Sequence, residues 1–204
     1  MAKLKAPLMS LGATGALGKS IVFFGWKGLN VAREYVVPSN PQSGPQTTQR
    51  GYLTEAVTLI HTAQADPTNP LGEVDKQAYA LWGSIFATPR TWFNQACKNC
   101  IDLQTAAKKG IIYHKGVSTP GAGQIGITLK RTKQGANDIT VGLIYYGTSK
   151  SAMLNSISAT IVAGAISGTI TGLTAGVKYF WQFKPSVHAD FNGSASGIYY
   201  STPT

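Results

Sequence analysis

The sequence predicts an α+β protein: an N-terminal β-hairpin arm with a small helical region, followed by an antiparallel β-sandwich. Three observations lead to this prediction. Apolar runs separated by glycine-rich turns lie near the N-terminus, apolar residues recur at three- and four-residue steps in the middle, and short alternating runs fill the rest. Helices followed by strands are typical of α+β proteins, so we expect segments at 1–43, 44–109 and 110–204.

The first segment predicts a hairpin and an extended connector. Two β-rich runs, 20–26 and 30–37, are joined by "KGL" at 27–29, with a glycine near the turn. Pro38 ends the second run, and Pro41 keeps the chain extended because residues before proline avoid the helical region. A connector rich in proline, amides and hydroxyls pairs poorly with itself, so we expect a partner to order it.

The middle segment predicts three helices. Ser43 or Gly44 can cap the first, with Pro45 in its first turn. After a loop with two prolines, "EVDKQAYALWGSIFA" predicts the second helix and "RTWFNQACKNCIDLQTAAKKG" the third. Gly110 is the natural stop of the third helix, because glycine favours the left-handed conformation that ends helices.

After Gly110 the helical periodicity disappears. Alternating segments with Gly, Asn or Pro turns predict about six or seven short strands, the pattern of an antiparallel β-sandwich. In "VKYFWQFKP" the residues Tyr179, Trp181 and Phe183 lie on one face, which we expect to be the core side of a half-buried strand.

The charge balance indicates an acidic partner. The chain has 18 Lys and Arg against 8 Asp and Glu, a net charge of +10. Nucleic acid, an acidic protein surface or an anionic glycan would each fit, but the basic residues are scattered, so direct binding of nucleic acid is the less favoured. No apolar run approaches the ~20 residues of a membrane span, and no secretory signal is visible.

The glycine-rich "GATGALGKS" has only a superficial likeness to a phosphate-binding loop. Five residues separate Gly12 from Gly18 where that loop has four, and a strand rather than a helix follows. We expect a glycine-permitted turn that leads into the hairpin. No nucleotide, cofactor or other ligand of this kind is predicted.

Cys97 and Cys100 form a lone CxxC, which is compatible with a redox pair or half a zinc site. The three histidines lie far apart, and no βαβ unit surrounds the motif. Two small apolar residues one helical turn apart is the simpler interpretation. The acidic residues form no pair in an apolar setting, so we predict no metal site, no catalytic residues and no enzyme.

The C-terminal segment, 110–204, resembles fibronectin type III domains. "TITGLTAGVKYFWQFKPSV" is similar to the end of that domain, where a leucine and a small turn lead into a tyrosine-bearing strand, here Leu173, 174–176 and Tyr179. "VGLIYYGTSKSAM" is similar to its mid-domain strand and "GSASGIYYSTPT" to its last strand. The tryptophan that this family carries on an early strand is missing here.

Residues 10–105 resemble a recurring N-terminal module of tailed-bacteriophage virion proteins. In that module a glycine-rich turn, a strand with "WKG", an arginine-bearing strand and a proline- and glutamine-rich motif lead into a helix. The matching residues are Trp26, Lys27, Gly28, Arg33, Pro38, Asn40, Pro41, Gln46, Gln49 and Arg50. The appended sandwich is a departure from the module.

The resemblance implies a non-enzymatic structural component of a phage virion, made in the host cytoplasm and accessory to capsid, head–tail junction or tail. Its partners would be other virion proteins and further copies of itself in the particle, with no membrane contact and no cofactor. Amide and hydroxyl side chains on the arm suit a wet protein interface. The predicted interface residues are Trp26, Lys27, Arg33, Asn40, Gln42, Gln46, Gln49 and Arg50.

A carbohydrate- or host-surface-binding module is the alternative, with nucleic-acid binding less favoured. Adjacent tyrosines occur at 145–146 and 199–200, and neighbours on a strand point to opposite faces. One of each pair would lie in the core, and the other would face outward to meet a sugar or a neighbouring subunit. Tyr146 and Tyr200 are the candidates for this contact.

Overall fold

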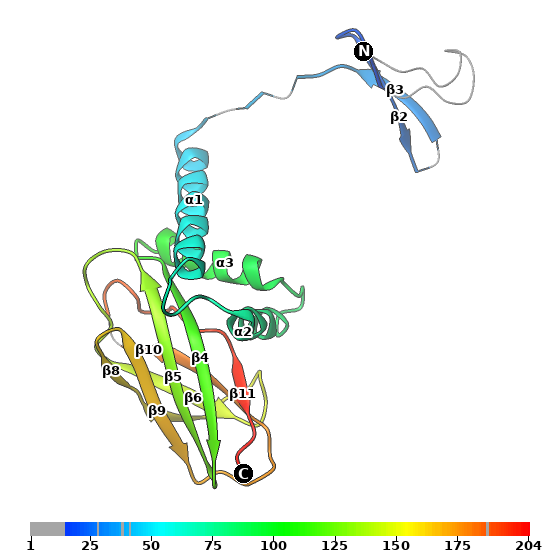
Figure 1. Ribbon diagram of the computed structural model, residues 1–204. Helices are drawn as coiled ribbons and strands as arrows, with labels where there is room; N and C mark the ends of the chain where they lie inside the picture. The colour runs from blue at the N-terminus through cyan, green and yellow to red at the C-terminus, as the bar shows by residue number, and fades with distance from the viewer. Residues whose placement is uncertain (1–14, 28, 38, 41, 187) are drawn as a thin grey trace. The chain divides into compact units, whose positions relative to one another are not determined.

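The computed structural model describes residues 15–27, 29–37, 39–40, 42–186 and 188–204 (Figure 1). The chain divides into two compact units, Met1–Ser43 and Gly44–Thr204. We call them the N-terminal unit and the main unit. The predicted turn glycine Gly28, the connector prolines Pro38 and Pro41 and the first glycine of the glycine-rich segment lie outside the described residues.

The N-terminal unit contains an antiparallel sheet in the order β1-β2-β3, built from Gly15–Leu17, Ile21–Trp26 and Leu29–Glu34. The predicted hairpin is β2 and β3, with Trp26 opposite Leu29. Two details differ from the prediction. The glycine-rich segment supplies a short strand as well as a turn at Gly18, whose φ is +60°. The last strand ends at Glu34; the N–H of Tyr35 still donates to the C=O of Ser20 at 2.8 Å, and 36–37 follow outside the strand.

The helical region has three helices, as predicted: α1 Gly44–Gln64, α2 Glu73–Gly83 and α3 Trp92–Thr105. The predicted ends of the last two are wrong. α2 stops at Gly83, and Ser84 closes it with backbone hydrogen bonds. α3 stops at Thr105, where Ala107 rather than a glycine takes a left-handed φ of +58°. The N–H of Gly110 instead donates to Gln134 Oε1 at 2.7 Å, beyond the helix.

The predicted sandwich is present, with two antiparallel sheets (Figure 1). One sheet has the order β4-β5-β9-β8 and the other the order β11-β10-β6-β7. In chain order this is the A-B-E-D and G-F-C-C′ connectivity of immunoglobulin-like sandwiches. The strands are β4 Ile111–Gly121, β5 Gln124–Lys133, β6 Gly142–Gly147, β7 Asn155–Ser158, β8 Thr160–Val162, β9 Ala165–Thr171, β10 Tyr179–Pro185 and β11 Tyr199–Ser201.

The described part of the sandwich therefore has one or two strands more than predicted. The segment that the sequence did not indicate is β4, the longest strand of the sandwich. The connectivity shows the fold class; the closer resemblance to fibronectin type III sequences stays a prediction.

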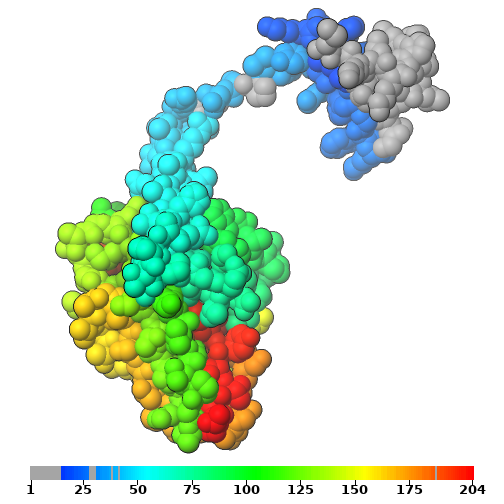
Figure 2. Space-filling model, viewed as in Figure 1, coloured from blue at the N-terminus to red at the C-terminus, as the bar shows by residue number. Residues whose placement is uncertain are grey.

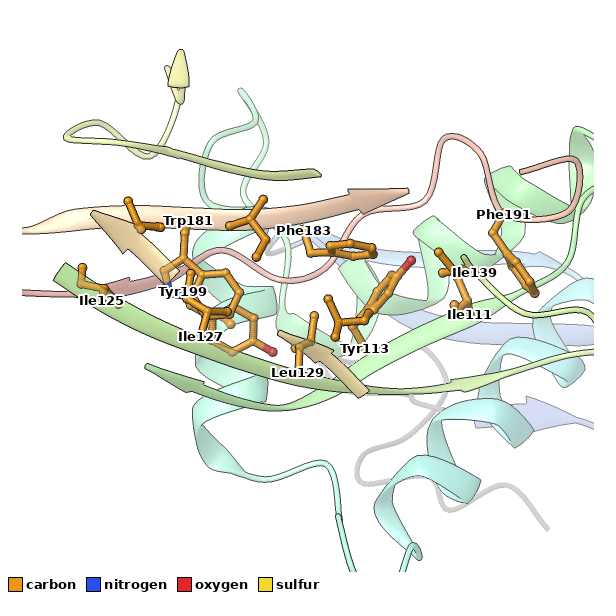
Figure 3. Close-up of a cluster of buried hydrophobic side chains, with 14 of the residues drawn as sticks. Ile111, Tyr113, Ile125, Ile127, Leu129, Ile139, Trp181, Phe183, Phe191 and Tyr199 are labelled. Carbon is orange, nitrogen blue, oxygen red and sulfur yellow. The ribbon is translucent and has the colours of Figure 1, made fainter. Parts of the chain in front are cut away.

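The sandwich core follows the predicted aromatic face. Trp181 and Phe183 on β10 are fully buried, and Tyr179 packs at the edge of the same cluster. The Trp181 and Tyr199 rings are stacked with centroids 4.4 Å apart, and both lie between the sheets in Figure 3. Burial of each such ring stabilises the fold by roughly 1.5–3 kcal/mol. The buried tryptophan of this sandwich, Trp181, thus lies on the late strand β10 and not on an early strand.

The helices cover an edge of the sandwich. β4 pairs only with β5, so its other edge would expose backbone N–H and C=O groups. The Tyr79 hydroxyl of α2 accepts from the N–H of Tyr113 at 3.0 Å and donates to its C=O at 3.2 Å. Ile112 of β4 is buried among helix residues rather than in the sandwich core. Helices and sandwich consequently form one compact unit.

Asp75 makes a second connection across this edge. Its carboxylate is buried and accepts from the N–H groups of Lys115 and Gly116, both at 2.9 Å. The register of β4 shifts between His114 and Val117, and the φ of Lys115 is +54°. The bulge turns two neighbouring N–H groups toward one carboxylate, which secures α2 to the strand.

Candidate interaction surfaces

The N-terminal unit exposes most of its apolar side chains. Within 15–43, none of the residues whose burial the structure describes, which leaves out 28–30, 38 and 41, is buried. Trp26 is 60% exposed, Val36 69% and Val37 72%. Val36 and Val37 follow the last strand as an extended apolar segment without ladder partners among the described residues. Contiguous exposed apolar residues of this kind mark interaction surfaces in soluble proteins.

The predicted interface residues of the hairpin lie at its exposed end and on its last strand. Lys27 is exposed beside Trp26, at the end of the β2–β3 pair. Arg33 is also exposed, and its guanidinium lies over the Phe24 ring, with Cζ 5.2 Å from the centroid. Asn40 and Gln42 in the connector are exposed.

The remaining predicted residues belong to the first turns of α1. Gln46, Gln49 and Arg50 are spaced three and four residues apart, so they share one face of the helix. All residues from 42 to 51 that the structure describes are exposed, and the first buried residue of α1 is Ala56. The first eight residues of α1, 44–51, are therefore exposed, and the buried face of the helix begins at Ala56.

The prediction for Tyr146 is wrong. Tyr146 lies opposite the buried Trp181 in the β6–β10 ladder, so it shares the core face, and it packs against the core cluster. Its neighbour Tyr145 faces outward, with the Lys184 Nζ 5.1 Å from its ring centroid. Tyr200 is 52% exposed, with Lys178 Nζ 4.6 Å from its ring centroid, and its contact with a sugar or a subunit stays a prediction.

Cys97 and Cys100 are buried free thiols of α3. The Cys100 thiol donates to the C=O of Ile111 at 3.6 Å, and burial raises its pKa to about 12. Burial also raises the pKa of Cys97. Thiols held in the protonated form are poor nucleophiles and metal ligands, so the arrangement matches small core residues.

The structure adds an apolar groove that sequence patterns did not indicate. It has a volume of about 740 Å³ and lies between α2 and the edges of β4 and β11. Val74, Val117 and Tyr200 are exposed along it. Figure 2 shows the red C-terminal strand at the surface beside the green of β4. The elements that form this groove are far apart in sequence, so no local pattern could identify it.

Two smaller depressions meet at Trp82, and we call them together the Trp82 site. The first, of about 290 Å³, lies between the end of α2, α3 and the loop near Asn192. The second, of about 500 Å³, lies beside the outer face of β6 and β10. Trp82, Asn192 and Gly193 line both. Half-buried aromatic residues surrounded by amides and charges are typical of ligand sites.

Three further observations concern metal binding, a buried carboxylate and membrane spans. Within the residues that the structure describes, no group of three or more His, Cys, Asp or Glu could hold a metal ion. The buried carboxylate of Asp75 accepts four hydrogen bonds, from Gly72, Lys115, Gly116 and Tyr199. No described helix is long and apolar enough to cross a membrane.

A comparison with protein-family models finds no match for this chain, and a comparison with curated proteins finds none either.

Proposed function

We propose that this protein is a non-enzymatic structural component of a tailed-bacteriophage virion, assembled through its N-terminal unit and the start of α1. The observation that carries the assembly role is the exposed apolar surface of residues 15–37, in which Trp26, Val36 and Val37 are 60–72% exposed. A small sheet whose described side chains are exposed or only half-buried is marginal in water, so it gains stability when a partner covers it.

The exposed first turns of α1 support the same role. Isolated helices shorter than about 12–15 residues are marginal in water, and most helix stability comes from packing. Gln46, Gln49 and Arg50 present amides and a cation on one face of these exposed first turns, 44–51. A wet interface with another protein would use such side chains.

The assignment to a virion is supported by the sequence resemblance of residues 10–105 to phage virion proteins. The net charge of +10 fits an acidic particle surface or packaged DNA nearby. Within the particle, an accessory position at the capsid or head–tail junction is favoured over a fibre. The sandwich would be a projecting or packed accessory domain.

The assembly role is tested by placing charge in the apolar segment of the full chain. The double variant Val36→Asp/Val37→Asp should lose incorporation into particles, since two carboxylates would be buried at the interface. Val162→Asp is the matched control, because Val162 is 66% exposed on the short edge strand β8 of the main unit. Mass spectrometry of purified particles would measure copies per virion for each variant.

Two results would contradict the proposal. One is normal incorporation of the double variant. The other is a purified wild-type monomer whose first ~50 residues resist protease, because the N-terminal unit would then need no partner. A copy number in the hundreds would indicate a shell or tube component, and about a dozen a neck or tail-tip part.

A further inference from the structure

Trp82 stands at the junction of two depressions, and its indole is half-buried between them. Volumes of about 290 and 500 Å³ lie near the range of about 300–1,000 Å³ that holds small ligands. None of the residues that line them belongs to the N-terminal unit. The Trp82 site is therefore independent of the surface that carries the proposed assembly role.

Arg90 presents a pre-positioned guanidinium in the first depression. Its Cζ lies 4.2 Å from the Phe86 ring centroid, and its Nη1 donates to Gln95 Oε1 at 3.0 Å. The Gln95 side chain is buried, so it is itself held in place. A stacked and hydrogen-bonded arginine loses little conformational freedom when it binds an anion, and its planar fork matches carboxylate and phosphate oxygens.

The other charges favour an anion as well. Lys108 is held by Nζ donating to the C=O of Asn192 at 2.6 Å, and Lys184 lines the second depression. Lys98 is neutralised by Asp102, with Nζ and Oδ2 2.7 Å apart. Together the lining has four cationic side chains and one carboxylate. This excess attracts a negatively charged group.

Asn99 adds an unsatisfied amide. Its residue is 6% exposed and lines the first depression, and its Nδ2 has no hydrogen-bond partner. A buried donor without an acceptor is costly, so a ligand oxygen that pairs with this amide gains affinity by removing the cost. The further polar residues of the lining are Gln95, Gln182, Ser186, Asn192 and Ser194.

We propose that the Trp82 site binds an acidic saccharide, with the sugar ring on the indole and its carboxylate or phosphate beside Arg90. Amides, hydroxyls and a carboxylate around one aromatic ring suit a ligand that carries several hydroxyl groups. A nucleic-acid strand would need a continuous cationic groove with successive aromatic platforms. Here one tryptophan stands where the two depressions meet, and the other aromatic residues, Phe86 and Tyr145, line different depressions, so the lining offers no continuous row of stacking platforms.

The test uses the full chain and a panel of immobilised oligosaccharides that carry uronate, sialate or phosphate groups. Each acidic glycan is paired with a neutral glycan of the same backbone, and titration calorimetry measures the dissociation constants of those that bind. At least one acidic glycan should bind in preference to its neutral pair. Trp82→Ala and Arg90→Gln should each weaken this binding about tenfold or more, since charged hydrogen bonds and stacking contribute at this scale.

Trp26→Ala is the matched control and should leave the binding unchanged, because Trp26 is an exposed tryptophan that lines neither depression. Trp82 packs against the helices, so thermal unfolding of each variant would verify its fold; Arg90→Gln provides a second variant outside the core. Lack of binding to every acidic glycan would overturn the proposal. So would unchanged affinity in both site variants, equal affinity for acidic and neutral pairs, or Trp82-dependent binding of a single-stranded oligothymidylate without glycan binding.

Discussion

The Tyr199 hydroxyl donates to Asp75 Oδ1 at 2.8 Å, across 124 positions of sequence. Both side chains are buried, and burial raises the pKa of Tyr199 well above its ordinary value, with a further contribution from Asp75. Asp75 lies in the first turn of α2, Tyr199 begins β11, and the same carboxylate accepts from the β4 bulge. One side chain therefore joins the helical region to both sheets of the sandwich.

Asp75→Asn should destabilise the main unit by about 2–4 kcal/mol. The amide nitrogen of asparagine cannot accept a hydrogen bond, so it would leave backbone N–H groups that now donate to the carboxylate without an acceptor. Urea unfolding of the full chain measures the change. Tyr199→Phe removes a single donor and should cost about 1 kcal/mol. Glu73→Gln is the control, since the Glu73 side chain is 76% exposed and pairs only with Lys76. A similar small loss for Asp75→Asn and Glu73→Gln would contradict the role of Asp75.

Tyr79→Phe should leave the N–H and C=O of Tyr113 without their described partner at the edge of β4. We expect a loss of about 1–3 kcal/mol, the cost of buried unpaired backbone groups. The amide of Tyr113 should also exchange its hydrogen faster, which mass spectrometry or NMR would detect. Tyr200→Phe serves as control, because Tyr200 is half exposed. An unchanged exchange rate in Tyr79→Phe would show that the helix does not protect this edge.

Gly197→Ala should be destabilising, because a Cβ there would lie 2.8 Å from the backbone carbonyl carbon of Ala78 and 2.9 Å from the N of Tyr79. Backbone atoms cannot rotate away, so we expect a loss of about 1–3 kcal/mol. Gly51→Ala is the opposite case, since it lies in α1 with nothing within 4 Å of a Cβ. It should stabilise the helix by up to about 1 kcal/mol. Thermal unfolding would distinguish the two, and equal shifts would count against close packing at Gly197.

His114 should make stability depend on pH in the mildly acidic range. Its side chain is buried, its Nε2 lies 2.9 Å from Thr132 Oγ1, and burial lowers its pKa. Because the unfolded chain takes up the proton first, the free energy of unfolding should fall as the pH drops below about 6.5.

The measurement is urea unfolding from about pH 7.5 to about pH 5.5, where carboxylates contribute little. His114→Gln removes the titrating ring and should flatten the dependence. A wild-type protein as stable at the lower pH as at the higher one would rule out this effect of His114.

Periodicity predicted the hairpin, the helices and the sandwich, but it did not indicate β4. Residues 111–114 are all buried, because Ile111 and Tyr113 face the sandwich core and Ile112 faces the helices. A strand buried on both faces has no alternation of apolar and polar residues, and the bulge after His114 disturbs the rest of the pattern.

The tyrosine pairs show a second limit. Two adjacent aromatic residues fit either face of a strand, and only the pairing of Tyr146 with Trp181 decides which of them points inward. The Trp82 site was not predicted for a similar reason. Trp82 has the spacing of a core residue of α2, and its ligand-like surroundings come from Arg90, Asn99 and Asn192 on other elements.

The sequence by itself determined the type and order of most secondary-structure elements, β1 and β4 excepted, and the polar, proline-containing connector, because residue spacing and turn chemistry act locally. The tertiary structure alone decided that the helical region covers the sandwich edge, that the first turns of α1 are exposed, and that Trp82 lies between two depressions. These features depend on contacts between residues far apart in the chain, such as Asp75 and Tyr199. Packing selects those contacts, and no local pattern encodes them.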